Sequence, residues 1–169
     1  DQHRAHGVEV RTSCTVDGLL GEHGRVCGVR LNDGSILDAD IVIVGIGIVP
    51  NIAPLIDAGA AGSPGGVRVD GYCRTTLPAI HAVGDCALHS NRWAGGAEIR
   101  VESVQNAVDQ ATVAAKDVLG TPTPYQALPW FWSEQGGLRL QMAGLLPAQA
   151  RTHRRPGANP DSFSLLHYV

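Results

Sequence analysis

The sequence is short of aromatic residues, of lysine and of long apolar runs, and these shortages exclude several classes of protein. Its 169 residues include three Trp, three Tyr and two Phe, and Lys116 is the single lysine. No apolar run approaches the roughly 20 residues of a membrane-spanning helix, and no basic segment followed by an apolar one marks a secretion signal. The formal net charge of −3 argues against a nucleic-acid-binding protein. We therefore expect a cytoplasmic protein that binds neither a membrane nor a nucleic acid.

The cysteines and histidines lack the spacings of metal sites. Cys14, Cys27, Cys73 and Cys86 form no CxxC pair, and no two histidines stand in an HxH or HxxxH arrangement. These spacings exclude a zinc knuckle and a thioredoxin-type dithiol. We expect four reduced, mostly buried thiols and no metal site.

The first third of the chain has the patterns of β-strands. Alternation of apolar and polar residues predicts a strand at residues 8–12, and another is expected at residues 25–31 after a Gly-rich break. Asn32-Asp33-Gly34 predicts a hairpin turn, because these residues tolerate positive φ, with residues 35–37 as the returning strand. Residues 41–44 form a continuous apolar run, which is typical of a strand buried on both faces.

The rest of the chain predicts strands around one long helix. Residues 102–119 carry apolar side chains at helical spacing, and Gly120 stands where a C-cap glycine belongs. A short helix is expected at residues 53–58. Further strands are expected at residues 67–69, 80–83, 138–142 and 162–169, and from residue 130 onward.

Gly84-Asp85 is the first candidate for chemistry, because it ends an expected apolar strand. In α/β folds ligands bind just beyond the carboxyl ends of strands. An aspartate there can accept hydrogen bonds from sugar or ribityl hydroxyls, and the glycine allows close backbone approach. The alternative interpretation is an ordinary turn in which Asp85 caps the backbone.

Two further segments are candidates with equally plain alternatives. Gly45 and Gly47 precede Pro50-Asn51, but no third glycine follows, so this is not a dinucleotide fingerprint. Residues 102–106 (Glu-Ser-Val-Gln-Asn) open the long helix, whose positive end favours an anion or an electron-rich ring oxygen. The alternative there is a capping arrangement that satisfies the first N–H groups.

Five stretches, in this order, resemble FAD-dependent ferredoxin reductases of the pyridine nucleotide–disulfide oxidoreductase superfamily. The last two are the most specific, because the wider superfamily lacks them. The stretches are residues 29–34 (VRLNDG), 40–51 (DIVIVGIGIVPN), 75–87 (TTLPAIHAVGDCA), 100–107 (RVESVQNA) and 129–135 (PWFWSEQ).

The resemblance implies roles for single residues. It places Gly84 and Asp85 at the ribityl and phosphate side of FAD. Ser103, Val104 and Gln105 would then lie at the helix start that faces the flavin pyrimidine end. It also implies catalytic positions for Glu102, near the nicotinamide approach, and for Trp132, beside the isoalloxazine ring. Gly45, Gly47, Pro50 and Asn51 would form the crossover from the NAD-binding to the FAD-binding segment.

The resemblance also implies an α/β fold that is a fragment of a flavoprotein with two dinucleotide-binding domains. Residues 1–50 would end the NAD-binding segment, residues 51–124 would form the second FAD-binding segment, and residues 125–169 would begin an α+β C-terminal domain that faces ferredoxin. Neither Gly-rich fingerprint of the family occurs in these residues. The chain is therefore expected to be the later portion of a longer reductase.

The implied activity passes electrons from NADH or NADPH through FAD to a 2Fe-2S ferredoxin or a rubredoxin. One alternative is a folded module that binds a partner but no flavin. Another is a relative of the nitrite-reductase or apoptosis-factor type on the same scaffold. Residues 129–169 carry a net charge of +2, and four arginines there are candidates for docking an acidic ferredoxin. A solvated charged loop is the alternative. These arginines are Arg139, Arg151, Arg154 and Arg155.

Overall fold

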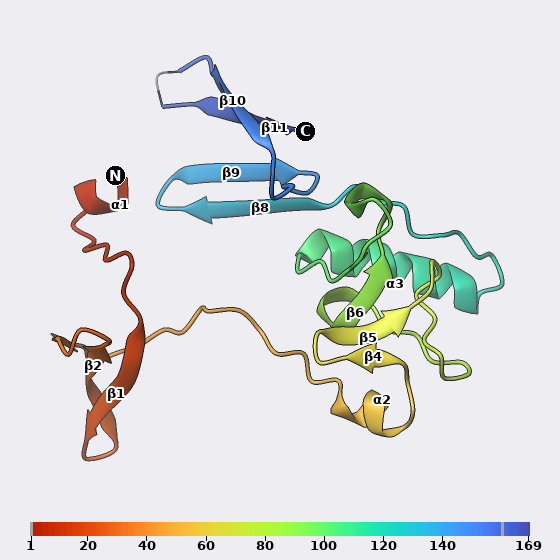
Figure 1. Cartoon of the computed structure of the whole chain (residues 1–169), viewed down its shortest axis with the longest axis horizontal. Helices are drawn as coiled ribbons and strands as arrows, with labels where there is room; N and C mark the ends of the chain where they lie inside the picture. Colours follow the sequence, from red (N-terminus) through yellow and green to blue (C-terminus); the bar gives the residue numbers. More distant parts are fainter. Residues whose placement is uncertain (1, 160) are drawn as a thin grey trace. The chain divides into compact units, whose positions relative to one another are not determined.

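A computed structural model describes residues 2–159 and 161–169, which divide into two compact units. The first unit ends at Ile48, and the second runs from Val49 to Val169 (Figure 1). Each unit contains its own sheet, and the second also contains the long helix. The expected mixed α/β architecture is confirmed. No helix in the described part of the chain is long and apolar enough to cross a membrane.

The first unit is built on a three-stranded antiparallel sheet in the order β1-β2-β3. Its elements are α1 (Gln2–Ala5), β1 (Val16–Glu22), β2 (Arg25–Leu31) and β3 (Ile36–Asp38). The hairpin predicted at residues 32–34 is confirmed. The Gly34 backbone has φ of +84°, and its N–H donates to the Leu31 carbonyl at 2.9 Å. Leu31 is the buried residue that anchors this turn to the sheet.

The second unit combines a four-stranded sheet, one long helix and two hairpins. The sheet has the order β4-β5-β6-β7, in which only the β5–β6 pair is parallel. Two antiparallel hairpins, β8–β9 and β10–β11, follow the helix α3. The elements are α2 (Ala53–Asp57), β4 (Gly62–Ser63), β5 (Gly66–Val69), η1 (Gly84–Cys86), β6 (Ala87–Ser90), η2 (Arg92–Ala94), β7 (Glu98–Ile99), α3 (Val104–Val118), β8 (Trp130–Gln135), β9 (Leu138–Ala143), β10 (Arg151–Pro156) and β11 (Phe163–Tyr168).

The core of the second unit lies where β5 and β6 pair. Val67 and Ala87 are fully buried opposite each other in this parallel pair, and Val69 and Ala82 extend the cluster. These side chains are small, which lets the strands and the turn at Gly84–Cys86 approach closely. The expected helix at residues 53–58 and the strand at residues 67–69 are confirmed here.

The strand predicted at residues 41–44 is wrong. These residues have no regular structure, and Ile43 is 91% exposed. A strand buried on both faces needs neighbours to pair with, and among the described residues the first sheet ends at β3. The strand expected at residues 8–12 is also wrong. The first strand is instead β1, in the Gly-rich break, where pairing with β2 outweighs the poor strand propensity of Gly18 and Gly21.

The strand predicted at residues 80–83 is wrong as well. Only a single bridge joins His81 to Arg74. The left-handed backbone of Ala79 and Gly84, with φ of +59° and +72°, bounds this segment and keeps it from extending. Asp85 therefore lies in the turn before β6 rather than beyond the end of a strand.

The long helix is confirmed, but its apolar stripe does not face the core. Ser103 caps α3, because its Oγ accepts the Asn106 N–H at 3.1 Å, and the Gly120 backbone has φ of +76°. The buried residues of α3 are Asn106 and Gln110, whereas Val104 is 65% exposed. A surface helix usually buries its apolar stripe. Here Asn106 and Gln110 have hydrogen-bond partners in the unit, whereas Val104, Val108 and Val118 are exposed.

The thiols differ in exposure. Cys14 and Cys27 are exposed, so the expectation of mostly buried cysteines is wrong for these two. Cys73 is buried, and this burial raises the pKa of its thiol to about 11. All four side chains are free thiols.

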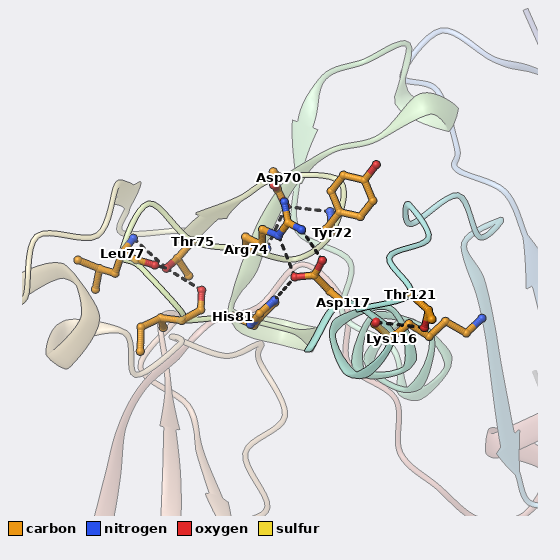
Figure 2. A network of polar contacts seen from close by, with 10 residues as sticks. Asp70, Tyr72, Arg74, Thr75, Leu77, His81, Lys116, Asp117 and Thr121 are labelled. Atoms are coloured by element: carbon orange, nitrogen blue, oxygen red, sulfur yellow. Dashed lines mark hydrogen bonds and ion pairs between the residues drawn. The ribbon is translucent and has the colours of Figure 1, made fainter. Parts of the chain in front are cut away.

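A network of charged side chains ties the C-terminal end of α3 to the loop that follows β5 (Figure 2). Asp117 Oδ2 accepts from Arg74 Nε at 2.8 Å and from His81 Nε2 at 2.8 Å. A second guanidinium nitrogen of Arg74 bonds to Asp117 Oδ1. The hydrogen bonds from Arg74 and then from His81 hold the pKa of Asp117 at about 2.

The acid branch of stability tests this network. Because the pKa of Asp117 is about 2 in the folded chain and about 3.9 when unfolded, its contribution is present above about pH 4. That contribution is lost as the pH falls toward 2. Asp117→Asn should lower the free energy of unfolding at pH 6 and flatten its fall between about pH 4 and 2, measured by urea unfolding. Asp109→Asn on the same helix is the control and should keep the wild-type slope. Identical slopes in the wild type and Asp117→Asn would contradict the network.

Candidate functional site

Three separate stretches of the second unit line one cavity of about 700 Å³. The first is the turn at η1, the second is the start of α3, and the third is β8. The volume lies within the roughly 300–1,000 Å³ of small-molecule sites. The lining residues are Val83, Gly84, Asp85, Glu102, Ser103, Val104, Ala107, Phe131 and Trp132.

The turn at η1 depends on glycine at position 84. The Gly84 backbone has φ of +72°, a conformation that residues with a Cβ rarely adopt. A Cβ at this position would lie 3.1 Å from Ala107 Cβ on α3. The Gly84 N–H donates to Gln110 Oε1 at 2.7 Å in a buried hydrogen bond. The turn that carries Asp85 is therefore fixed directly on the helix.

A buried set of amides around His89 fixes the orientation of Gln110. Gln110 Oε1 is committed to Gly84, so its Nε2 faces His89 Nδ1 at 3.3 Å. Asn91 Oδ1 accepts the Trp93 N–H at 2.8 Å, so its Nδ2 faces His89 Nε2 at 3.1 Å. A protonated imidazole would turn N–H groups toward both amide nitrogens, and burial also lowers the pKa of His89. These surroundings favour the neutral form of His89, in which one ring nitrogen accepts an amide N–H.

The start of α3 is fixed by a second buried pair. Tyr125 Oη donates to Asn106 Oδ1 at 2.8 Å, and Asn106 Nδ2 donates to the Val101 carbonyl at 2.9 Å. Burial raises the pKa of the Tyr125 hydroxyl to about 12, so it stays protonated and can donate. These bonds hold the segment that leads into Glu102 and Ser103 at the cavity wall.

The β8 strand contributes the aromatic wall. The Trp132 indole stacks on the Trp130 indole with ring centroids 5.1 Å apart. Phe131 and Trp132 also line the cavity while remaining partly exposed. An apolar wall facing carboxylates and a helix start suits a flat ring that carries polar groups at its edge.

The structure brings most of the sequence-predicted site residues together. Six of them line the cavity: Gly84, Asp85, Glu102, Ser103, Val104 and Trp132.

The remaining predicted site residues are elsewhere. The Gln105 side chain lies outside the cavity lining and donates to Asp109 Oδ1 at 2.9 Å instead. Gly45 and Gly47 belong to the first unit. Pro50 and Asn51 begin the second unit, and neither is among the described residues that line the cavity.

Sequence reasoning missed the residues that support the cavity. Gln110, His89 and Asn91 occur in no motif that marks a ligand site. A signal was present for Gln110, because Asn106 and Gln110 stand four residues apart and so lie on one face of the helix. Within residues 2–159 and 161–169, no group of three His, Cys, Asp or Glu side chains could hold a metal ion.

Comparison with known protein families agrees with this architecture. Residues 1–111 match the family described as pyridine nucleotide-disulphide oxidoreductase, and residues 130–169 match the family described as reductase C-terminal. The chain belongs to the pyridine nucleotide-disulphide oxidoreductase family. The resemblance inferred from the sequence is thus confirmed at the level of the family.

Two of the similar proteins are named as reductases. The 5,5'-dehydrodivanillate O-demethylase ferredoxin reductase subunit of Sphingobium sp. is 54% identical over 99% of this chain and 40% of its own length. Rhodocoxin reductase of Rhodococcus erythropolis is 48% identical over 99% of this chain and 39% of its own. The chain thus spans about 40% of the length of these curated relatives.

A solved structure shares the fold. The crystal structure of the ferredoxin reductase for the CYP199A2 system from Rhodopseudomonas palustris superposes with a TM-score of 0.90 at 38% identity. The match covers 99% of this chain and 41% of that one. The putidaredoxin reductase in its covalent complex with putidaredoxin gives a TM-score of 0.88 at 37% identity, over 98% of this chain and 40% of the other.

Replacement of Gly84 tests whether the turn at η1 needs a glycine at this position. Gly84→Ala should lower the free energy of unfolding by more than the roughly 1–2 kcal/mol of a left-handed residue, because its Cβ also meets Ala107. Gly95→Ala is the matched control, since its φ is +65° and nothing lies within 4 Å of the added Cβ. Urea unfolding measures both. Equal losses in the two variants would show that the contact with Ala107 does not matter.

Proposed function

We propose that this chain forms the flavin-facing part of an NAD(P)H–ferredoxin reductase. The observation that carries the proposal is the cavity in which Gly84 and Asp85, the start of α3 and Trp132 meet. Residues 1–50 would end the NAD-binding segment, residues 51–124 would be the second FAD-binding segment, and residues 125–169 would face ferredoxin. The match of residues 130–169 to a reductase C-terminal family supports the last of these.

The residues of the cavity fit a flavin. Its apolar wall contains Val104, Phe131 and Trp132, which suits a flat ring system. Asp85 and Glu102 add carboxylate oxygens, which accept hydrogen bonds from hydroxyl groups. The positive end of the 15-residue helix α3 favours an electron-rich ring edge. Apolar walls with few polar groups are the usual composition of a cofactor site.

FAD, when bound, supplies the chemistry of accepting a hydride from NADH or NADPH and releasing single electrons to an iron–sulfur protein. In this proposal Asp85 accepts hydrogen bonds from the ribityl hydroxyls. The helix start at Ser103, Val104 and Gln105 stabilises negative charge at the pyrimidine end of the ring through its N–H groups. Glu102 lines the nicotinamide approach, and Trp132 packs beside the ring.

Four residues keep a role that rests on the family resemblance. Gly45, Gly47, Pro50 and Asn51 would form the crossover that leads from the NAD-binding segment to the FAD-binding segment. The boundary between the two units, at Ile48 and Val49, lies inside this stretch and supports a connection of that kind.

The hairpin β10–β11 is the proposed docking surface for an acidic 2Fe-2S ferredoxin or a rubredoxin. Arg151, Arg154 and Arg155 all lie on the exposed strand β10. Arg154 also stacks over the Phe163 ring at 4.5 Å, which holds its guanidinium against the hairpin. Arg139 is less suited, because it pairs with Glu134 at 2.9 Å. A soluble redox partner of this kind is consistent with a cytoplasmic location.

The test uses the complete gene product purified from cells. We expect a yellow protein with flavin absorbance that oxidises NADH or NADPH with an artificial acceptor. Asp85→Ala should lose most of the bound flavin, because the ribityl hydroxyls lose their acceptor. Asp57→Ala, on the exposed end of α2, is the control and should keep the flavin.

The outcomes separate the alternatives. A colourless wild-type protein that does not oxidise either nucleotide would contradict the reductase and favour a module without flavin. An active flavoprotein that fails to reduce any ferredoxin or rubredoxin would instead favour a relative with another acceptor. Reduction of ferredoxin that slows with rising salt and with Arg154→Glu would support docking at β10.

A further inference from the structure

We propose that Arg100 is a positioning residue that holds Glu102 in place and ties it to the turn of Asp85. This inference rests on the proposed reductase function. Arg100 Nη1 donates to the Asp85 carbonyl at 3.0 Å and forms an ion pair with Glu102 Oε1 at 2.7 Å. One nitrogen therefore joins two of the three stretches that line the cavity, although Arg100 is not itself among the lining residues.

The surroundings of Arg100 suit this role. Its side chain is 19% exposed, whereas that of Glu102 is 42% exposed. An exposed glutamate without a partner samples several rotamers, and an ion pair with a less exposed guanidinium favours one of them. The main chain beside Arg100 is also fixed, because the Val101 carbonyl accepts from the buried Asn106 amide. The main chain that carries Arg100 is thus held in place next to the side chain that contacts Glu102.

A second arginine–glutamate pair provides the comparison. Arg68 Nε lies 2.6 Å from Glu98 Oε1 in an ion pair, and Arg68 Nη2 donates to Glu98 Oε2 at 2.9 Å. This pair bridges β5 and β7 on the sheet, and neither residue lines the cavity. It has the same chemistry as the pair at Arg100 without any connection to the site. Arg68→Gln is therefore the matched control.

Arg100 acts through Glu102 in this inference, so its loss should matter only while Glu102 is present. We expect Arg100→Gln to slow reduction of the bound flavin by NADH about tenfold, because a misplaced group near the reacting centre loses rate. Flavin content and the flavin dissociation constant, measured by fluorescence, should stay within about twofold of the wild type. In a Glu102→Gln background, Arg100→Gln should have little further effect on the rate.

The experiment is a double-mutant cycle in the complete gene product. It measures flavin reduction by stopped flow, flavin affinity by fluorescence and NAD⁺ binding by titration for the wild type, both single variants, the double variant and Arg68→Gln. Arg100→Lys, which keeps the positive charge, should recover part of the rate and replaces Arg100→Gln if that variant does not fold. Unchanged behaviour of Arg68→Gln shows that loss of a surface ion pair alone has no effect.

Each outcome decides one claim. Additive effects of Arg100→Gln and Glu102→Gln, with an active wild type, would overturn the positioning role and leave the reductase intact. Loss of flavin in Arg100→Gln with a normal reduction rate per bound flavin would also overturn it, since Arg100 would then act on the turn of Asp85 alone. A wild type without flavin or NADH oxidation would overturn the proposed function itself, together with this inference.

Discussion

The hydrogen bond from the Gly84 N–H to Gln110 Oε1 is the constraint on which the site depends. It joins a turn with a left-handed glycine to the only long helix among the described residues. Because Gln110 is fully buried, leaving either partner unsatisfied costs the desolvation of a polar group, about 1–3 kcal/mol. Asp85 follows Gly84 directly, so the position of its main chain is set by the same bond.

The polar face of α3 extends this constraint across the cavity. Gln110 fixes the turn at η1, and Asn106 fixes the segment that leads to Glu102. The His89 and Tyr125 rings, which contact Gln110 and Asn106, meet edge to face with centroids 5.1 Å apart. Arg100 links the turn at η1 to Glu102. A helix that buries amides and exposes valines is costly unless the amides have partners, and the two α3 amides do: Asn106 bonds to Val101 and Tyr125, and Gln110 accepts from Gly84.

The local parts of the fold could be predicted from the sequence, and the parts that depend on partners could not. Ser103 and Gly120 mark the ends of α3, and Gly34 marks a hairpin, because caps and turns depend on a few neighbouring residues. Residues 41–44 have an ideal strand pattern but no pairing partner among the described strands. The exposed apolar stripe of α3 is a similar case, because the spacing of apolar residues predicts which helix face is apolar but not what that face contacts.

In the candidate site, too, the sequence predicted the residues in local motifs but not those that act through distant contacts. The motifs containing Asp85, Glu102 and Trp132 are recognisable in sequence, and the structure brings these residues to one cavity. The residues that hold them, Gln110 and Arg100, act through single hydrogen bonds across long sequence separations. A local sequence pattern cannot predict such long-range bonds.

The most direct test measures both the flavin affinity and the free energy of unfolding of Gln110→Leu in the complete gene product. Thr75→Val is the matched control, because it removes part-buried hydrogen bonds of the loop before Gly84 and Thr75 does not line the cavity. We expect both variants to lose about 1–3 kcal/mol of unfolding free energy. Only Gln110→Leu should bind flavin more weakly, by about tenfold. Equal flavin affinity in the two variants would contradict the claim that Gln110 positions the flavin-binding turn.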